Sequence, residues 1–362
     1  MQDPLLWMLV AVLGGFVWFE PTGWHGAMHG IHLPTLEILA GLMILTQGLE
    51  HSRFLDHVGQ FLIRVAPHER VLARWLTLFT ALLATVLTND IALFVVVPLT
   101  LALQRHGLPS WRRLVIMEAL AANVGATLSP LGSPQNIFLW QTSGVSLGAF
   151  LSMMGAWVVW LVIGLALLVE HAFVRRPLAR QDSAPPVMVN RSLFRLSALL
   201  YLPFLIAAES GHPGWALATT TPLALLHRPL LNRIDWGLLA IFTLFFIDIG
   251  WLRTIFDAYR LPGLGAQPTP MAWLMWGVGL SQGISNVPAT LYLERSDSNF
   301  RALAYGVNAG GFGWVIGSMA NLIALRLARD RPIWREFHRF SVPFLGYALC
   351  TAILVLQGDK LL

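Results

Sequence analysis

Long apolar segments recur along the whole chain, and they constrain the fold more than any other feature of the sequence. The hydrocarbon core of a bilayer is about 30 Å thick, so a helix of about 20 apolar residues crosses it. Only 12% of the 362 residues are charged, whereas about a quarter are charged in a typical soluble domain. The sequence therefore predicts an all-α polytopic membrane protein.

About nine apolar segments are predicted to cross the membrane. They are residues 5–19, 33–49, 114–140, 147–173, 196–209, 214–227, 236–250, 302–325 and 340–357. Two short amphipathic helices, at Arg53–Arg64 and Trp251–Arg260, each follow a span and are predicted to lie at the membrane surface.

Two further apolar regions are each interrupted by a polar tip, and both are predicted to be re-entrant hairpins. Residues 88–90 interrupt region 70–104, and residues 285–288 interrupt region 271–294. After the second tip only Ala289–Leu293 remains before the next charged residue, which is too short to cross. The first region has the length for two complete spans, and its hairpin prediction rests on its likeness to the second.

Lys and Arg residues fall mainly on one side of the predicted membrane, which sets the orientation. With a cytoplasmic N-terminus, 19 of the 24 Lys and Arg residues lie in cytoplasmic segments and 5 lie outside. Because basic loops stay in the cytoplasm, a cytoplasmic N-terminus is predicted. The membrane topology thus explains the excess of basic over acidic residues. Membrane lipid is an expected partner and nucleic acid is not, since no soluble domain is present to hold a basic patch.

One long polar stretch, residues 174–195, divides the chain and is predicted to be a cytoplasmic linker. Residues 1–173 form the predicted first repeat. A connecting span at 196–209 precedes the predicted second repeat, residues 210–362. Because this connecting span is an odd insertion, it inverts the second repeat relative to the first.

An internal similarity supports the two repeats. Asn123–Asn136 aligns without gaps on Asn308–Asn321, and the two segments share five identical residues. They lie in the predicted spans 114–140 and 302–325, and each follows a hairpin. Inverted repeats with broken helices that meet near the bilayer midplane are a common basis of alternating access.

Glycine, proline and serine run through both of these spans, so both are expected to be broken helices. Irregular backbone at membrane depth occurs only where it is buried in protein or lines a cavity. The freed carbonyls can coordinate a cation, and the N–H groups that open the next half-helix can hold an anion. The residues predicted to bind substrate or ion are Thr88, Asn89, Asp90, Asn123, Gly125, Ser129, Gly132, Asn136, Ser285, Asn286, Asn308, Gly310, Ser318 and Asn321. Close helix packing is the alternative role for such residues.

Oxygen atoms at the tips and breaks also predict two sodium sites, because hard cations prefer oxygen ligands. The first site would use Asn89, Asp90 and Gly125, and the second would use Ser285, Asn286 and Gly310.

Asp90 is the most pointed single candidate, because an acid at membrane depth is a functional candidate by default. It can ligate a cation or carry a proton. The alternative is that it caps the next half-helix beside a water-filled vestibule. Other acids near span ends are expected to be solvated at the interface, and they are Glu37, Glu118, Glu170, Glu209 and Asp248.

No nucleophile–base arrangement, P-loop or dinucleotide-binding fingerprint occurs in the sequence. No catalytic residue or cofactor is therefore predicted, and transport without an ATP site would be coupled to an ion gradient. A membrane-embedded enzyme or a structural subunit is the alternative from another class. An enzyme would need paired acid–base or metal-binding residues at matching depth.

These motifs resemble those of the ion transporter superfamily, which contains arsenite permeases, citrate and dicarboxylate transporters, and sodium/proton antiporters of the D type. Residues 88–93 with Pro98, and residues 123–136, are similar to the first-half signature. Residues 285–288 and 308–321 are similar to the second-half signature. Nearly the whole chain fits, and it is most similar to the YbiR group of bacterial inner-membrane proteins.

The resemblance implies an inverted-repeat fold in the bacterial cytoplasmic (inner) membrane, often a homodimer, with a scaffold part and a moving transport part. In the dicarboxylate branch each tip carries Ser-Asn-Thr, which binds sodium and the substrate carboxylates. Asp90 and Val287 stand here in place of the two threonines, and an added negative charge repels a dianion.

We therefore expect a secondary transporter of a small inorganic or organic anion, whether an oxyanion, an arsenite-like species or a carboxylate. Its transport would be coupled to protons or sodium. The alternative within transport is a cation/proton antiporter that uses Asp90.

Overall fold

The structure is a computed structural model, and it describes residues 4–19, 28, 30–105, 108–178, 187–258, 268–295 and 298–358. These residues form helices joined by turns and loops. Within them there is one isolated β-bridge and no β-strand. The predicted all-helical class is confirmed.

The first half contains α1 (Pro4–Phe19), α3 (Leu33–His51), α4 (Phe54–Val65), α5 (Glu69–Val86), α6 (Asn89–Arg105), α7 (Trp111–Leu128), η2 (Pro130–Gly132), α8 (Pro134–Ser143) and α9 (Leu147–Ala172). The second half contains α10 (Arg191–Glu209), α11 (Pro213–Thr219), α12 (Thr221–Leu226), η3 (Arg228–Arg233), α13 (Trp236–Ala258), α14 (Pro270–Ile284), α15 (Asn286–Leu293), α16 (Phe300–Ala309), η4 (Val315–Gly317), α17 (Met319–Ala328) and α18 (Pro332–Gly358).

Among the described residues, α9, α10 and α18 are long and apolar enough to cross a membrane by length and composition. Shorter apolar helices lie at Leu6–Trp18, Asn89–Gln104, Trp236–Leu252 and Met319–Ala328.

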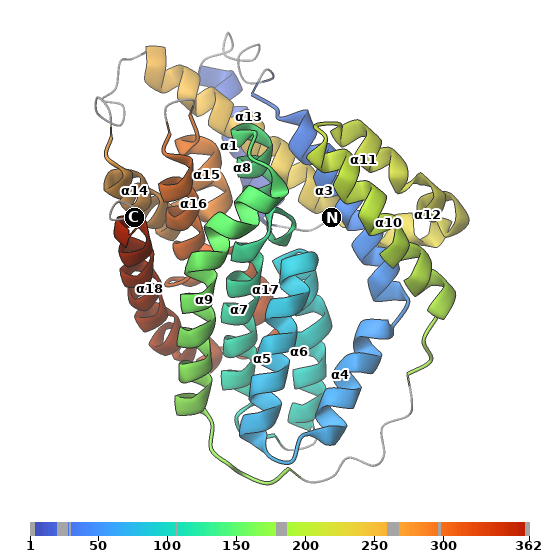
Figure 1. Cartoon of the computed structure of the whole chain (residues 1–362). Helices are drawn as coiled ribbons and strands as arrows, with labels where there is room; N and C mark the ends of the chain where they lie inside the picture. Colours follow the sequence, from blue (N-terminus) through green and yellow to red (C-terminus); the bar gives the residue numbers. More distant parts are fainter. Residues whose placement is uncertain are drawn as a thin grey trace.

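Two helical hairpins lie in opposite halves of the molecule. Hairpin 1 is α5 and α6, and hairpin 2 is α14 and α15. Figure 1 shows hairpin 1 in the lower half beside α7, whereas hairpin 2 lies in the upper half beside α16. Their tips are at Thr88 and Ser285, where one helix ends and the next begins.

Two interrupted helix pairs, α7–α8 and α16–α17, follow the hairpins. The first break has Pro130 and Pro134, which carry no backbone N–H and cannot continue a helix. The second break has no proline and uses glycine instead, including Gly313 with a φ of 91°. Such a conformation strains a residue with a Cβ atom.

Two elements differ from the expectations drawn from sequence. Residues 214–227 do not form one helix, because the chain ends α11 at Thr219 and restarts α12 with Pro222 in its first turn. The separate helix expected from Trp251 is also wrong. Helix α13 runs unbroken through Trp251 to Ala258, and residues 259–260 lie outside the described residues. The helix expected at Arg53–Arg64 is present as α4.

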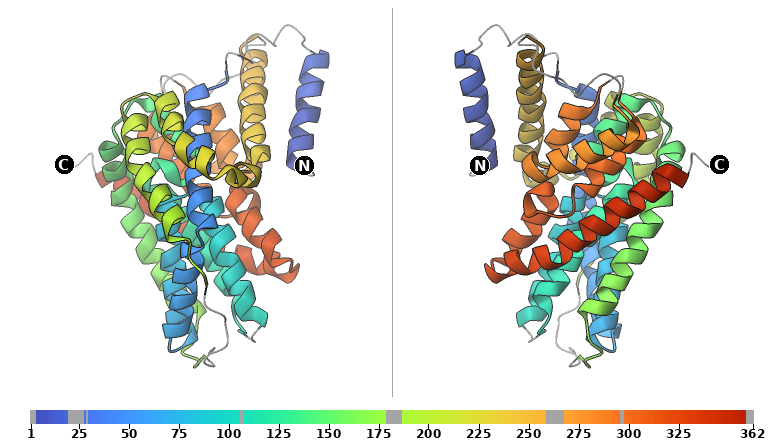
Figure 2. Two further views of the ribbon diagram at one scale, coloured as in Figure 1. Left: turned by 90° about the vertical axis from the view of Figure 1, so that its right-hand side faces the viewer. Right: turned by 90° about the vertical axis from the view of Figure 1, so that its left-hand side faces the viewer.

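The N-terminal helix α1 packs against α13, and both panels of Figure 2 show the two helices side by side at one edge of the molecule. Helix α13 also contacts α3 and α15. It therefore connects the edge of the protein with the helix that begins at the tip of hairpin 2.

Candidate functional site

Four buried asparagines join the two broken helix pairs. The Asn123 side-chain nitrogen donates to Asn321 Oδ1 at 2.8 Å, and the Asn308 side-chain nitrogen donates to Asn136 Oδ1 at 2.8 Å. In each pair the first asparagine of one aligned segment bonds the last asparagine of the other segment. We call these four residues the amide clasp.

The clasp also occupies carbonyls that the helix breaks release. Asn136 Nδ2 donates to the Ala126 carbonyl and Asn321 Nδ2 donates to the Gly311 carbonyl, both at 2.9 Å. Each bond spans ten residues and lies at the same place in the aligned segments. The side chains therefore replace backbone partners that the helix breaks remove, as buried backbone requires.

The first helix of each hairpin holds the adjacent break. Thr85 Oγ1 donates to the Gly125 carbonyl at 3.1 Å, and Gln282 Nε2 donates to the Gly310 carbonyl at 2.6 Å. The carbonyls of the two predicted sodium ligands Gly125 and Gly310 therefore each accept a side-chain hydrogen bond within the protein.

Thr85 and Gln282 are not among the residues predicted from the sequence, although a signal for them exists. Thr85 lies three residues before the tip residue Thr88, and Gln282 lies three residues before the tip residue Ser285. Each is thus about one helical turn from its tip, on the same face of the helix. Comparing the two hairpins position by position, rather than by tip motif alone, would have found them.

Each hairpin tip carries an asparagine whose amide nitrogen has no hydrogen-bond partner among the described residues. Asn89 Oδ1 accepts a bond from the Asp90 N–H at 3.0 Å, and Asn286 Oδ1 accepts one from Ser285 Oγ at 3.5 Å. The Nδ2 atoms of both asparagines are without a hydrogen-bond partner among the described residues, although both side chains are buried.

The tip of hairpin 2, at Ser285 and Asn286, which we call tip 2, reaches the amide clasp; the tip of hairpin 1 is tip 1. A Cβ atom built on Gly311 would lie 3.3 Å from Asn286 Nδ2 and 3.5 Å from Asn123 Oδ1. Asn286 from the second half and Asn123 from the first half therefore flank the same glycine. Ser318 adds a further link, because its Oγ donates to Asn123 Oδ1 at 2.9 Å.

Other predicted residues of the first break have local roles. Ser129 Oγ accepts a bond from the Leu131 N–H at 3.1 Å. A Cβ atom on Gly132 would lie 2.4 Å from Ala126 Cα, so glycine permits the close turn. Ser133 was not singled out from the sequence; it is fully buried, and its Oγ has no partner among the described residues.

Ser285 has an unusual backbone conformation, with φ at 74° and ψ at 155°. This region is essentially restricted to glycine, and other residues in it are held there by their surroundings at a cost of about 1–3 kcal/mol. Such strain concentrates at ligand-binding sites. Here the strain lies at Ser285, the residue immediately before α15.

Two cavities lie beside the tips. The first, of about 660 Å³, is lined by Thr88 and Asp90 of hairpin 1 together with residues of α3, α13 and α17. The second, of about 510 Å³, is lined by Ser285 of hairpin 2, by Asp248 of α13 and by residues of α1 and α17. Met319 and Arg326 of α17 line both cavities.

The charges in the first cavity have both signs. Its lining includes three arginines and three acids, namely Arg233, Arg326, Arg329, Glu50, Asp90 and Asp235. The Asp90 side chain is 7% exposed, and its Oδ1 has no partner among the described residues.

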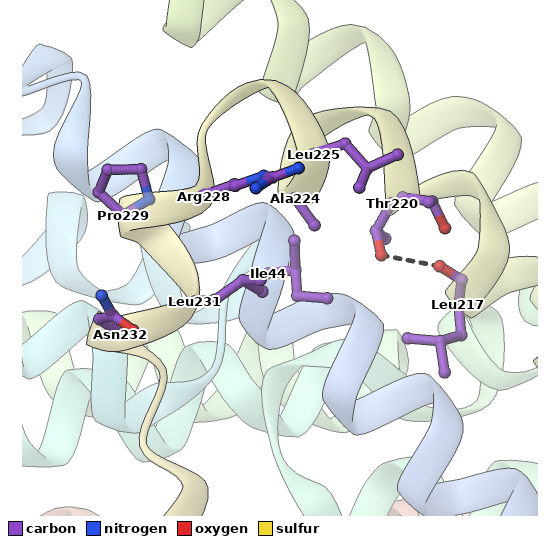
Figure 3. Close-up of a pocket in the computed structure, with 10 residues that line it drawn as sticks. Ile44, Leu217, Thr220, Ala224, Leu225, Arg228, Pro229, Leu231 and Asn232 are labelled. Atoms are coloured by element: carbon purple, nitrogen blue, oxygen red, sulfur yellow. Dashed lines mark hydrogen bonds between the residues drawn. The ribbon is translucent and has the colours of Figure 1, made fainter.

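A further cavity of about 520 Å³ lies apart from these residues, between α3, α11, α12 and η3 (Figure 3). Its lining contains Thr220, whose Oγ1 donates to the Leu217 carbonyl at 2.7 Å. It contains none of the residues predicted to bind substrate or ion.

The acids expected at the interface divide into two groups. Glu170 is half-buried, and its carboxylate pairs with the guanidinium groups of Arg70 and Arg74. Glu209 is exposed and accepts a bond from the Leu147 N–H at 2.7 Å.

For Glu118 and Asp248 the expectation of interfacial solvation is wrong. Glu118 has no solvent exposure, and its Oε1 accepts a bond from Thr100 at 2.5 Å. Asp248 is 5% exposed. Position along a span does not reveal which neighbouring helices cover a residue; for Glu118 these are the helices around α7, chiefly α5 and α6.

Comparisons with known proteins agree with this architecture. A family model described as citrate transporter matches residues 4–294. Inner membrane protein YbiR of Escherichia coli is 39% identical over 354 residues, covering 97% of this chain and 94% of the relative. An uncharacterized transporter of Methanocaldococcus jannaschii is 28% identical over 303 residues, covering 83% of this chain and 82% of the relative.

A silicon efflux transporter of Oryza sativa subsp. japonica is 29% identical over 126 residues, which cover 34% of this chain and 26% of the relative.

Proposed function

The chain belongs to the citrate transporter family, and from that premise we propose that it is a secondary active transporter of a small anion. It moves an oxyanion, an arsenite-like species or a carboxylate across a bacterial cytoplasmic membrane by alternating access. Transport is coupled to protons or sodium, and the N-terminus is cytoplasmic.

The observation that carries the proposal is the meeting of tip 2 with the amide clasp at Gly311. Broken helices that converge from two inverted repeats are the usual setting of a transport site. The clasp bonds join residues 198 and 172 positions apart, and each runs from the first asparagine of one aligned segment to the last asparagine of the other. This reciprocal pattern supports two inverted repeats with boundaries at 1–173 and 210–362.

The free hydrogen-bonding groups at the tips favour an anion. Asn89 and Asn286 are only 4% and 3% exposed, and their Nδ2 donors have no partner among the described residues. Each also opens a helix, α6 or α15, whose first N–H groups carry a partial positive charge. A small anion at a tip would accept bonds from both sources.

The arginines around the larger cavity support an anion entrance. Arg233, Arg326 and Arg329 line a space that continues to Thr88 at tip 1. The same lining carries three acids, so an anion would bind here to individual arginines and not to an excess of positive charge. The positive-inside rule places these arginines on the cytoplasmic side, so this cavity is the cytoplasmic entrance in the proposed orientation.

Uptake by purified protein in liposomes under an imposed pH or sodium gradient tests the proposal. Arsenite, phosphate, citrate and silicic acid are the probes, the last because of the rice relative. We expect an anionic probe to accumulate. Accumulation of silicic acid alone contradicts the anion assignment, and no gradient-driven movement of any solute in a wider screen contradicts the transporter assignment.

Asn286→Ala removes the free donor at tip 2. A hydrogen bond to a charged ligand contributes about 1.5–3 kcal/mol, so the half-saturating substrate concentration should rise about 10–100-fold. Thr142→Ala is the matched control, because the Thr142 hydroxyl bonds only within α8 and its own turn. Equal uptake by the Asn286 variant and the control contradicts a binding role for Asn286.

A cation/proton antiporter is the second candidate, and Asp90 favours it. Its carboxyl is buried and its Oδ1 lacks a partner among the described residues. In the same liposomes Asp90→Asn should preserve anion uptake if the first proposal holds. Loss of sodium/proton exchange in this variant, with anion uptake absent in both proteins, favours the antiporter.

A further inference from the structure

Asp248 lies in a cavity that is otherwise almost entirely apolar. The cavity of about 510 Å³ is bounded by α1, α13, hairpin 2 and α17. Apart from Asp248, the polar residues on its lining are Ser285 and Arg326. Neither oxygen of the Asp248 carboxyl has a hydrogen-bond partner among the described residues. Asp248 therefore joins no two described helices by a hydrogen bond of its carboxyl.

The positions of Asp248 and Asp90 are related. Each hairpin tip faces one cavity, and each cavity holds one buried acid without a full set of partners. The cavities have two lining residues in common, Met319 and Arg326 of α17. Asp90 thus lines the same cavity as Thr88 of tip 1, and Asp248 lines the same cavity as Ser285 of tip 2.

An unpaired carboxylate anion is unstable in such a place. Burying an ionised carboxylate without a counter-charge costs several kcal/mol. Arg326 lines the same cavity, but it forms no ion pair with Asp248 within the part of the chain that the structure describes. The carboxyl therefore requires a positively charged species that the described residues do not supply.

The cavity suits a proton better than a metal ion. Sodium and similar hard cations need several oxygen ligands, and the lining offers only the Ser285 hydroxyl besides Asp248. A proton needs a single carboxyl oxygen. The apolar walls from α1 and α13 also favour the neutral acid over the anion.

We propose that Asp248 binds a coupling proton at the tip of hairpin 2 and releases it when this cavity opens to water. The inference rests on the proposed transport function and names the residue that couples it to the proton gradient. On binding, a hydronium ion transfers its proton to a carboxylate oxygen of Asp248 and leaves as water. On release, the carboxyl O–H bond breaks and a water molecule in the opened cavity takes the proton.

The surroundings of α13 supply few competing charges. Helix α1 has no titratable residue between Pro4 and Phe19. The ring of His32 lies 6.4 Å from the ring of Phe246, half a helical turn before Asp248. The remaining titratable residues on elements packed against α13 or across the cavity are Glu37, Glu50, His51, Tyr292 and Arg326.

Asp248→Asn separates coupling from transport. With the membrane potential clamped at zero, a gradient of one pH unit drives up to about tenfold accumulation per coupled proton, since tenfold corresponds to about 1.4 kcal/mol. With arsenite, phosphate or citrate as the probe, whichever the unsubstituted protein accumulates, the variant should lose this accumulation. It should still exchange labelled for unlabelled probe at equal pH on both sides.

Infrared spectroscopy of the reconstituted protein tests the proton itself and needs no substrate. The unsubstituted protein at neutral pH should have a C=O stretching band of a buried protonated acid that Asp248→Asn removes. Asp56→Asn is the control for both measurements, because Asp56 is on the outer face of α4 in an exposed pair with Arg53.

The outcomes separate this inference from the proposed function. Failure of the unsubstituted protein to move any probe contradicts the transport function and leaves the infrared band to decide whether Asp248 holds a proton. Proton-driven accumulation by Asp248→Asn equal to that of the unsubstituted protein overturns the coupling role. An unchanged infrared band in that variant overturns the proton site.

Discussion

At the residue scale, Ser285 combines a strained backbone with a place at a hairpin tip. A φ of 74° is a backbone conformation that glycine adopts freely and that strains a residue with a Cβ atom. If the strain serves binding, relieving it should stabilise the fold and weaken function. This is the stability–activity trade-off expected where a site holds an unfavourable conformation.

Ser285→Gly is therefore expected to stabilise the protein by about 1 kcal/mol, because relief of about 1–3 kcal/mol of strain exceeds the entropy that glycine adds to the unfolded chain. Ser285→Ala is the control, since it removes the same hydroxyl and keeps the strain. Thermal unfolding in detergent measures both. Equal stability of the two variants would mean that Ser285 carries no strain.

Several site residues could be predicted one by one from the sequence because their chemistry is unusual at membrane depth. Asn89, Asp90 and Asn286 interrupt apolar runs, and such interruptions are visible without a structure. Thr85 and Gln282 were not predictable in this way, because one hydroxyl or amide within a helix is ordinary. The role of Thr85 depends on a carbonyl 40 residues away in the chain, and that of Gln282 on one 28 residues away.

At the scale of elements, each helix break packs closely against the first helix of its hairpin. A Cβ atom on Gly125 would lie 1.9 Å from the Ala81 carbonyl oxygen, and one on Gly310 would lie 2.4 Å from Ser281 Cβ. The Ala81 carbonyl is part of the backbone, and it cannot rotate away from an added Cβ atom as the end of a flexible side chain can. The Gly125 contact therefore fixes the distance between α5 and α7.

Gly125→Ala should destabilise the protein by about 1–3 kcal/mol, the usual cost of overpacking, and should reduce transport by displacing the break from hairpin 1. Gly155→Ala in α9 is the matched control, because the nearest atom to its Cβ would be Leu128 Cδ1 at 3.8 Å. There, alanine should be neutral or stabilising by up to about 1 kcal/mol, since it favours helix over glycine. Similar unfolding temperatures for the two variants would contradict the close contact.

The limits of element prediction have a common cause. The breaks after α7 and α16 were predictable because proline and clustered glycine act locally. The end of α11 was missed because hydropathy continues across it while Pro222 does not allow the helix to continue. The false boundary at Trp251 arose from a change in residue type that leaves the helix unbroken.

At the scale of the whole molecule, the amide clasp makes one unit of two distant chain segments. It joins α7 and α8 from the first half to α16 and α17 from the second. The alignment of residues 123–136 with 308–321 was evident from the sequence, but the crossed pairing was not. Similarity identifies equivalent residues, whereas the bonds join residues that are not equivalent.

A double-mutant cycle tests the clasp. Asn123→Ala leaves the buried Asn321 Oδ1 without its donor, and Asn321→Ala removes one of the two acceptors of Asn123 Nδ2. Each substitution should cost about 1–3 kcal/mol. The double variant should be less destabilised than the sum by about 1 kcal/mol, because the second substitution removes the orphaned partner. Asn123→Ala with Asn308→Ala, which are not bonded to each other, should be closer to additive. A cycle for Asn123 and Asn321 that is fully additive in denaturant unfolding contradicts the direct bond.

The reciprocal bonds also restrict how such a chain can diverge over generations. Asn123 bonds Asn321, so a substitution at position 123 is compensated by a substitution at position 321. Position 308, which aligns with position 123, does not contact it through this bond. The two aligned segments, 123–136 and 308–321, are therefore expected to change together at bonded positions and not at equivalent positions. A chimera that combines residues of the first half of one relative with the second half of a distant relative would therefore carry clasp residues that are not matched for hydrogen bonding.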